Sequence, residues 1–243
     1  MTEGAHVIAF GGHPDDVELA VGGTILVLRA RGYEVAIVDC TRGELGTRGT
    51  AEIRAEESVE AARRLGVTQR INLGLPDGHL RATDEARKKV VEVIRRLKPV
   101  IVIAPRPDDL HPDHAHASVL VREAAFLAGV ARFGGGGAPH RPRAMLEYAS
   151  HTMFPPSFVV DVSEHFAAKK HAALAYKSQF HDPGSKDPAT YISSSGFWDW
   201  WDGRARHFGN LVGAKYGEPF FVEGPLLVRD PVAQFLDFGY YPR

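Results

Sequence analysis

The first half of the chain alternates short apolar runs with longer segments in which apolar residues recur at helical spacing. Short strands are predicted at 6–10, 34–40, 70–73 and 100–104, and helices at 17–31, 51–65, 84–97 and 114–129. Strands that alternate with helices are typical of a parallel sheet covered by helices on both faces. The sequence therefore predicts an α/β fold with a Rossmann-like, mostly parallel sheet. In such sheets, ligands bind at the carboxyl ends of the strands.

The second half of the chain is less regular and predicts extra C-terminal strands and helices beside this sheet. We expect strands at 144–150, 158–162 and 220–223, and helices from Ser163 to about Phe180 and from Phe197 to Tyr216. The chain has 243 residues, which fits one large domain or two small ones. Because no composition break or internal repeat divides it, we expect a single domain over residues 1–243.

The charge balance and the hydropathy pattern limit the partners. Lys and Arg number 29 against 30 Asp and Glu, a net charge of −1 that excludes unselective binding of nucleic acid. No run of about 18 apolar residues and no basic, then apolar, leader is present, so we expect no membrane partner and a cytoplasmic protein. The single cysteine, Cys40, excludes an internal disulfide and a cysteine-based zinc site.

Two short segments mirror each other at the ends of predicted strands. Residues 13–16 read His-Pro-Asp-Asp and residues 111–114 read His-Pro-Asp-His. Each opens a predicted helix, where proline is favoured at the first position. Because residues three apart at a helix start can face the same side, His13 and Asp16 can converge on one point. His111 and His114 can approach that point from the neighbouring loop.

The residue types in these segments suit a catalytic metal site. Catalytic zinc takes three nitrogen or carboxylate ligands and keeps one position for water, and His13, Asp16 and His114 supply such a set. Asp15 is then placed to act as a general base, and His111 to stabilise an oxyanion or protonate the leaving group. The alternative is that each segment only caps its helix. The presence of two such segments, each after an apolar strand, argues for the metal site.

The sequence around both segments resembles the PIG-L/LmbE family of metal-dependent N-acetylglucosaminyl deacetylases. The resemblance is carried by AFGGHPDDVELAVGGT and RPDDLHPDHAHAS and spans nearly the whole chain. It is greatest to the bacillithiol-biosynthesis deacetylases, in the segments TRGELGTRGTAEIRAEE, NLGLPDGHL, AALAYKSQF and YGEPFF. The resemblance implies hydrolysis of N-acetyl-α-D-glucosaminyl L-malate to acetate and the free amine, with Zn²⁺ or Fe²⁺ as the metal.

The family pattern assigns the same roles to the motif residues and adds two substrate contacts. By this resemblance, Arg54 contacts the sugar or its aglycone and Asp77 contacts the sugar. Each also has a simpler interpretation. Arg54 lies on a predicted helix rich in glutamate, where it can form a solvated ion pair. Asp77 lies in a Pro-Asp-Gly sequence, where it can be an ordinary turn residue.

Leu110 keeps another substrate open, and a non-catalytic protein is a separate alternative. It stands where close relatives often carry an arginine, which would bind the malate carboxylates, and Arg42, Arg48 and Arg106 are the candidates to replace it. One alternative is a deacetylase for another N-acetylglucosamine sugar, such as the free sugar, a chitooligosaccharide or a mycothiol-like conjugate. The other is a non-catalytic metal-binding protein, which would need neither the general base nor the oxyanion histidine.

The late part of the chain carries further candidates. The aromatic segment 197–201 can line a sugar site, form a subunit contact or pack in the core. Tyr191, in the preceding loop, is a candidate to face the metal. His151 and His181 lie in loops and are the histidines outside the two motifs best placed to join a site. The family resemblance implies a homo-oligomer, often a hexamer.

Overall fold

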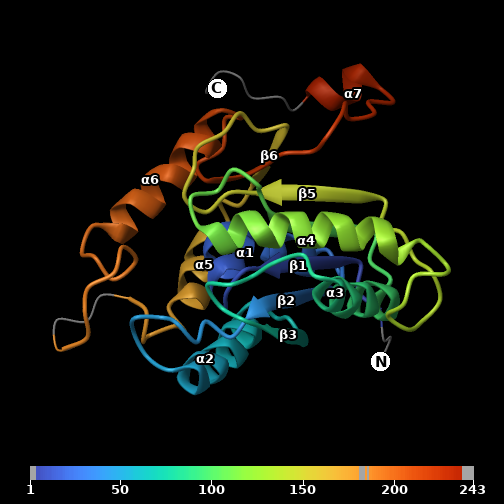
Figure 1. The fold of residues 1–243 in the computed structure, drawn as a ribbon. Helices are drawn as coiled ribbons and strands as arrows, with labels where there is room; N and C mark the ends of the chain where they lie inside the picture. The colour runs from blue at the N-terminus through green and yellow to red at the C-terminus, as the bar shows by residue number, and fades with distance from the viewer. Residues whose placement is uncertain (1–3, 181–183, 185, 237–243) are drawn as a thin grey trace.

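A five-stranded parallel sheet in the order β3-β2-β1-β4-β5 forms the centre of the computed structural model (Figure 1). The structure describes residues 4–180, 184 and 186–236. The strands are β1 Val7–Gly11, β2 Val35–Thr41, β3 Gln69–Leu75, β4 Ile101–Pro105 and β5 Ala144–Tyr148. The α/β fold with a mostly parallel sheet, predicted from the alternating pattern, is therefore confirmed.

Helices cover both faces of this sheet. The helices of the first half are α1 Asp16–Ala30, α2 Ala51–Arg64, α3 Asp84–Leu97 and α4 Pro112–Ala128. Successive residues of a strand point to opposite faces. Ile8 of β1 packs into a core with α3 and α4, whereas Val7 and Ala9 pack into a second core with α1 and α2. Cys40 is buried in β2, as its place in an apolar run predicts.

The C-terminal part adds a second layer on the α1 side. Strands β6 Phe158–Asp161 and β7 Gly217–Phe220 form an antiparallel pair. A single bridge from Glu147 to Phe221 joins this pair to β5. The C-terminal helices are α5 Phe166–Ala173, α6 Phe197–Asn210 and α7 Pro231–Leu236. In α6, Phe197 and Trp201 are buried in a third core with α5, so part of the aromatic segment packs in the interior.

Three predicted boundaries in the second half are wrong. The helix expected to reach Phe180 ends at Ala173, because Tyr176 turns into the core, where its hydroxyl approaches Glu18. The helix expected to reach Tyr216 ends at Asn210. A Cβ at Gly209 would lie 2.7 Å from the carbonyl oxygen of Ala214, so the chain folds back onto this glycine. The last strand consequently covers 217–220 instead of 220–223.

Membrane-crossing helices were expected to be absent. Among the residues described, no helix has the length and apolar character needed to cross a membrane.

Candidate active site and metal centre

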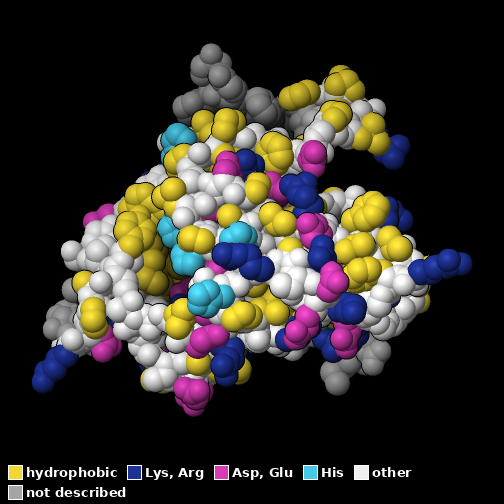
Figure 2. All heavy atoms as spheres, viewed as in Figure 1, with side chains coloured by type: hydrophobic (Ala, Val, Ile, Leu, Met, Phe, Trp, Pro, Cys, Tyr) yellow, Lys and Arg dark blue, Asp and Glu magenta, His cyan; other side chains and the backbone are white. Residues whose placement is uncertain are grey.

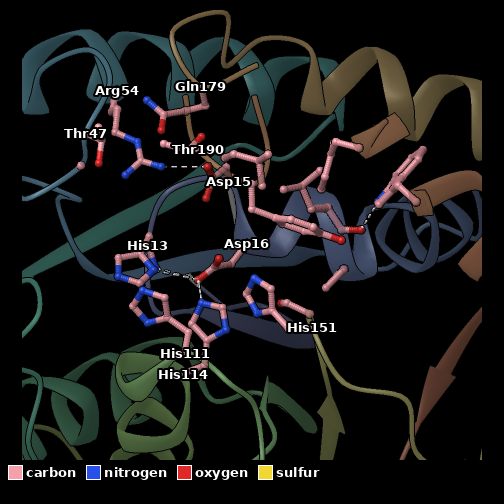
Figure 3. Close-up of a pocket in the computed structure, with 18 of the residues that line it drawn as sticks. His13, Asp15, Asp16, Thr47, Arg54, His111, His114, His151, Gln179 and Thr190 are labelled. Atoms are coloured by element: carbon pink, nitrogen blue, oxygen red, sulfur yellow. Dashed lines mark hydrogen bonds and ion pairs between the residues drawn. The ribbon is translucent and has the colours of Figure 1, made fainter. Parts of the chain in front are cut away.

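The two mirrored segments meet at the carboxyl edge of the sheet, because β1 and β4 are adjacent strands (Figure 3). Residues 13–16 lead from β1 into α1, and residues 111–114 lead from β4 into α4. The close approach depends on Gly12. A Cβ there would lie 3.0 Å from Cδ2 of His114 and 3.2 Å from Oδ2 of Asp16. The glycine therefore allows the end of β1 to approach the second segment.

Three side chains converge as the sequence predicts for a metal site. Nδ1 of His13 lies 3.4 Å from Oδ2 of Asp16, and Nε2 of His114 lies 3.0 Å from the same oxygen. Ligand atoms around a tetrahedral zinc, at bond lengths of 2.0–2.1 Å, are about 3.3 Å apart. Two imidazole nitrogens and one carboxylate oxygen at these spacings fit a zinc or iron ion. Burial opposes ionisation of Asp16, but the two histidines hold its pKa well below the usual value.

Carboxylates behind the two histidines orient their rings. Nε2 of His13 lies 3.1 Å from Asp77 and 3.4 Å from Asp113, which leaves Nδ1 facing Asp16. Nδ1 of His114 lies 3.2 Å from Asp109, which leaves Nε2 facing Asp16. Metal-binding histidines commonly use the second ring nitrogen in this way, which fixes their tautomer. The sequence analysis missed Asp109 and Asp113, although both lie in or next to the second motif.

Asp15 and Arg54 form a buried ion pair at the same edge. Nη2 of Arg54 donates to Oδ2 of Asp15 over 2.8 Å, and both side chains are less than a tenth exposed. Burial raises the pKa of Asp15 to about 6, although Arg54 favours its charged form. Asp15 also has a left-handed backbone, with φ of 113°, which is strained for a residue other than glycine. The interpretation of Arg54 as a solvated surface ion pair is therefore wrong.

Asp77 is both a turn residue and a buried residue at the edge of the site. It lies in a turn before Gly78, which has a positive φ of 70°. Its side chain is nevertheless buried, because Oδ1 reaches His13 and Oδ2 accepts a hydrogen bond from the backbone of Leu45 over 2.8 Å. These contacts leave Asp77 at the edge of the site, where it positions a predicted metal ligand.

His111 faces the three converging side chains as a neutral donor. Its Nδ1 accepts a hydrogen bond from the backbone of Asp113 over 3.2 Å, so Nε2 carries the proton in the neutral ring. Burial, together with the nearby His13 and His114, lowers the pKa of His111. The ring centres of His111 and His13 are 4.7 Å apart. A donor of this kind suits an oxygen atom that becomes negative during a reaction.

A cavity of about 390 Å³ opens over these residues. All seven site residues predicted from the sequence line it: His13, Asp15, Asp16, Arg54, Asp77, His111 and His114. In Figure 2, histidine side chains gather at the middle of the viewed face, beside hydrophobic side chains on the α6 side. Among the late-chain candidates, Tyr191, Phe197, Trp200 and Trp201 line the cavity. The ring centres of Tyr191 and Trp200 are 5.7 Å apart.

Two further residues of the cavity wall lie outside the two motifs. His151, one of the two loop histidines singled out, lines it, and its Nδ1 lies 2.8 Å from Asp109. His181 lies outside the described residues. Arg204 of α6 also lines the cavity, and no sequence pattern marked it. The three arginines considered as replacements at Leu110 are not among the described lining residues, and Leu110 itself is 75% exposed.

Comparison with known proteins connects this site with deacetylases. The family model for PIG-L, described as GlcNAc-PI de-N-acetylase, matches residues 8–125, which include both mirrored segments. The diacetylchitobiose deacetylase of Thermococcus kodakarensis is 32% identical to the chain. The alignment covers 95% of this chain and 88% of that protein.

Solved structures extend the similarity to the whole fold. The conserved protein TT1542 from Thermus thermophilus superposes with a TM-score of 0.84 and is 38% identical, covering 93% of this chain and 98% of that one. The N,N'-diacetylchitobiose deacetylase from Pyrococcus horikoshii, complexed with its inhibitor, gives a TM-score of 0.77 at 28% identity. That match covers 90% of this chain and 84% of the other.

Proposed function

The chain belongs to the PIG-L family, and from this membership we propose that it is a metal-dependent deacetylase that removes the N-acetyl group of an N-acetylglucosamine-containing sugar. One observation carries the proposal. The two mirrored loops bring His13, Asp16 and His114 to one point, beside Asp15 and His111 in the same cavity. A protein that only binds a metal needs no buried carboxylate and no imidazole donor next to it.

The proposed chemistry assigns a step to each of the residues around the cavity. A divalent metal held by His13, Asp16 and His114 would polarise the amide carbonyl. It would also lower the pKa of the attacking water, so that this water loses a proton more easily. Asp15 takes the proton of that water as the new C–O bond forms. It then returns the proton to the nitrogen as the C–N bond breaks, so the products are acetate and a free amine. His111 donates from Nε2 to the carbonyl oxygen as negative charge develops on it.

Arg54 and Asp77 have supporting roles in this proposal. Arg54 holds the carboxylate of Asp15 in a fixed orientation through the 2.8 Å hydrogen bond. Asp77 holds His13 through Nε2. The family resemblance adds contacts from both residues to the sugar, and their places on the cavity wall are compatible with that role. The donor set suits Zn²⁺ and Fe²⁺ alike.

For the substrate, we propose N-acetyl-α-D-glucosaminyl L-malate, with a chitin disaccharide as the second candidate. The bacillithiol-type sequence segments support the malate conjugate. The disaccharide is supported by two similar proteins named diacetylchitobiose deacetylases and by the aromatic wall of Tyr191 and Trp200, which suits a sugar ring. We also propose a single domain and a cytoplasmic location, and the resemblance supports a homo-oligomer such as a hexamer. Light scattering would test the oligomeric state.

Acetate release tests the proposed function. The purified protein, with its metal content measured, is incubated with the malate conjugate, diacetylchitobiose and N-acetylglucosamine at equal concentrations. We expect stoichiometric acetate and free amine from at least the first of these. Preference for diacetylchitobiose would select the second candidate. Absence of acetate from all three, with one metal bound per chain, would contradict the proposal.

A further inference from the structure

Arg204 is a cavity residue that forms no direct ion pair with another described residue. Its Nη2 donates to the carbonyl oxygen of Ala149 over 2.7 Å and approaches that of Thr152 at 3.5 Å. Its guanidinium carbon lies 5.0 Å from the ring centre of Phe208. No carboxylate of the described residues forms a direct ion pair with it, although Glu218 and Asp109 lie near enough to favour its charged form, and its Nε is buried without a hydrogen-bond partner. Burial lowers the pKa of Arg204 to about 10, so it remains cationic at neutral pH.

Two hydroxyl groups beside Arg204 are also unpartnered. Oγ of Ser150 and Oγ1 of Thr152 are buried, and neither has a hydrogen bond within the described structure. Ser150 and Arg204 both line the cavity. We call Arg204, Ser150 and Thr152 the Arg204 corner. Buried polar atoms in folded proteins nearly always have partners, so the unpartnered atoms of Ser150 and Arg204 in the cavity wall indicate a ligand that supplies them.

Two other arginines, Arg48 and Arg95, are buried without an ion pair, but neither is among the described residues that line the cavity. Arg95 donates to four backbone carbonyl groups, and Arg48 donates to carbonyl groups of the 178–188 segment. Arg54, which also lines the cavity, is neutralised by Asp15. Arg204 therefore provides a cationic group in the cavity wall whose charge remains available to a ligand.

The Arg204 corner lies next to the candidate metal centre. Ser150 precedes His151, whose ring stacks on His114 at 5.3 Å between ring centres. Figure 3 shows His151 on the opposite side of Asp16 from Arg54. A sugar whose N-acetyl group lies at the metal centre can thus extend the rest of the molecule toward the corner.

We propose that the Arg204 corner binds a carboxylate in the group attached to N-acetylglucosamine, and that it makes the enzyme select acidic conjugates. The proposal rests on the proposed deacetylase function. A carboxylate can accept from the guanidinium and from the hydroxyl of Ser150, and such charge-assisted hydrogen bonds are about twice as strong as neutral ones. The carboxylate then forms a direct ion pair with Arg204. Binding of the acidic group therefore needs no arginine at position 110.

A matched pair of substrates tests this proposal through charge alone. One is the carboxymethyl glycoside of N-acetylglucosamine, and the other is its carbamoylmethyl glycoside, which has the same shape and no charge. We expect the metal-loaded wild type to prefer the acid by about tenfold or more in kcat/KM. In Arg204→Gln this ratio falls to about one. In Ser150→Ala it falls by a few-fold.

Arg206→Gln is the control variant. Arg206 lies on the same helix, but it pairs with Asp202 and Tyr216 and is not among the described cavity residues. We expect this variant to keep the wild-type ratio. An equal rate for the two glycosides in the wild type, or an unchanged ratio in folded Arg204→Gln, would overturn the proposal.

Calorimetry separates this proposal from the deacetylase function. The metal-loaded His111→Asn protein, in which Asp15 still neutralises Arg54, is titrated with each glycoside, so that binding is measured while turnover is slowed. Tighter binding of the acid by about tenfold supports the anion site even if neither glycoside releases acetate, in which case only the deacetylase function fails. Equal binding of both compounds would contradict the proposed anion site, whether or not acetate is released.

Discussion

The exchange of Asp15 for Asn removes the proposed general base with little change in shape. Asparagine tolerates a positive φ, so the left-handed backbone at this position is preserved. A positioned acid–base group contributes about 10²–10⁴-fold to the rate, or about 2.7–5.5 kcal/mol of barrier. We expect kcat for acetate release to fall by that factor. Asp15 is not among the proposed metal ligands, so the metal content is expected to stay at the wild-type level.

The same exchange also has a cost in stability. The amide oxygen of Asn still accepts from Arg54, but the buried guanidinium loses its counter-charge, and hydrogen bonds to charged groups contribute about 1.5–3 kcal/mol. We expect the free energy of unfolding to fall within that range, measured by urea denaturation. Asp84→Asn, at a side chain that is 83% exposed at the start of α3, is the control and should keep full activity. Near-normal kcat in metal-loaded Asp15→Asn would refute the role of Asp15.

Three further results follow from the contacts around the metal centre. Asp109→Ala removes the carboxylate that orients His114 and His151, and the metal dissociation constant, measured by competition with a chelator, should rise about 10–100-fold. Gly12→Ala places a Cβ 3.0 Å from the ring of His114 and should weaken metal binding, which is measured as loss of metal during dialysis. The circular dichroism of this variant should match that of the wild type. Addition of metal at about 100 times its dissociation constant should stabilise the metal-free protein by about 2.7 kcal/mol, a rise in Tm of about 5–10 °C by calorimetry.

Local patterns are sufficient to predict the central sheet and the core of the site. The continuous apolar run at 100–104 identifies β4, because a strand covered on both faces is apolar along its length. The mirrored His-Pro-Asp segments give the proposed ligands, because both follow strands that lie side by side. These features depend on residues that are close in sequence or on a general rule of parallel sheets.

The remaining features depend on contacts between distant segments, which no local pattern reports. The Arg204 corner forms only because α6 packs against the 149–152 segment, about fifty residues earlier in the chain. The end of α5 is set by Tyr176, which leaves the helix to reach Glu18, and the end of α6 by the return of the chain onto Gly209. In each case tertiary packing overrides a helical pattern that continues in the sequence.

Removal and return of the metal test the central claim most directly. The protein is freed of metal with a chelator, and acetate release from N-acetylglucosaminyl malate and from diacetylchitobiose is measured as Zn²⁺ or Fe²⁺ is added back. We predict no release without metal and recovery that saturates at one equivalent per chain, with no recovery in His114→Ala. Full activity in the metal-free protein, or equal recovery in His114→Ala, would contradict the proposed site.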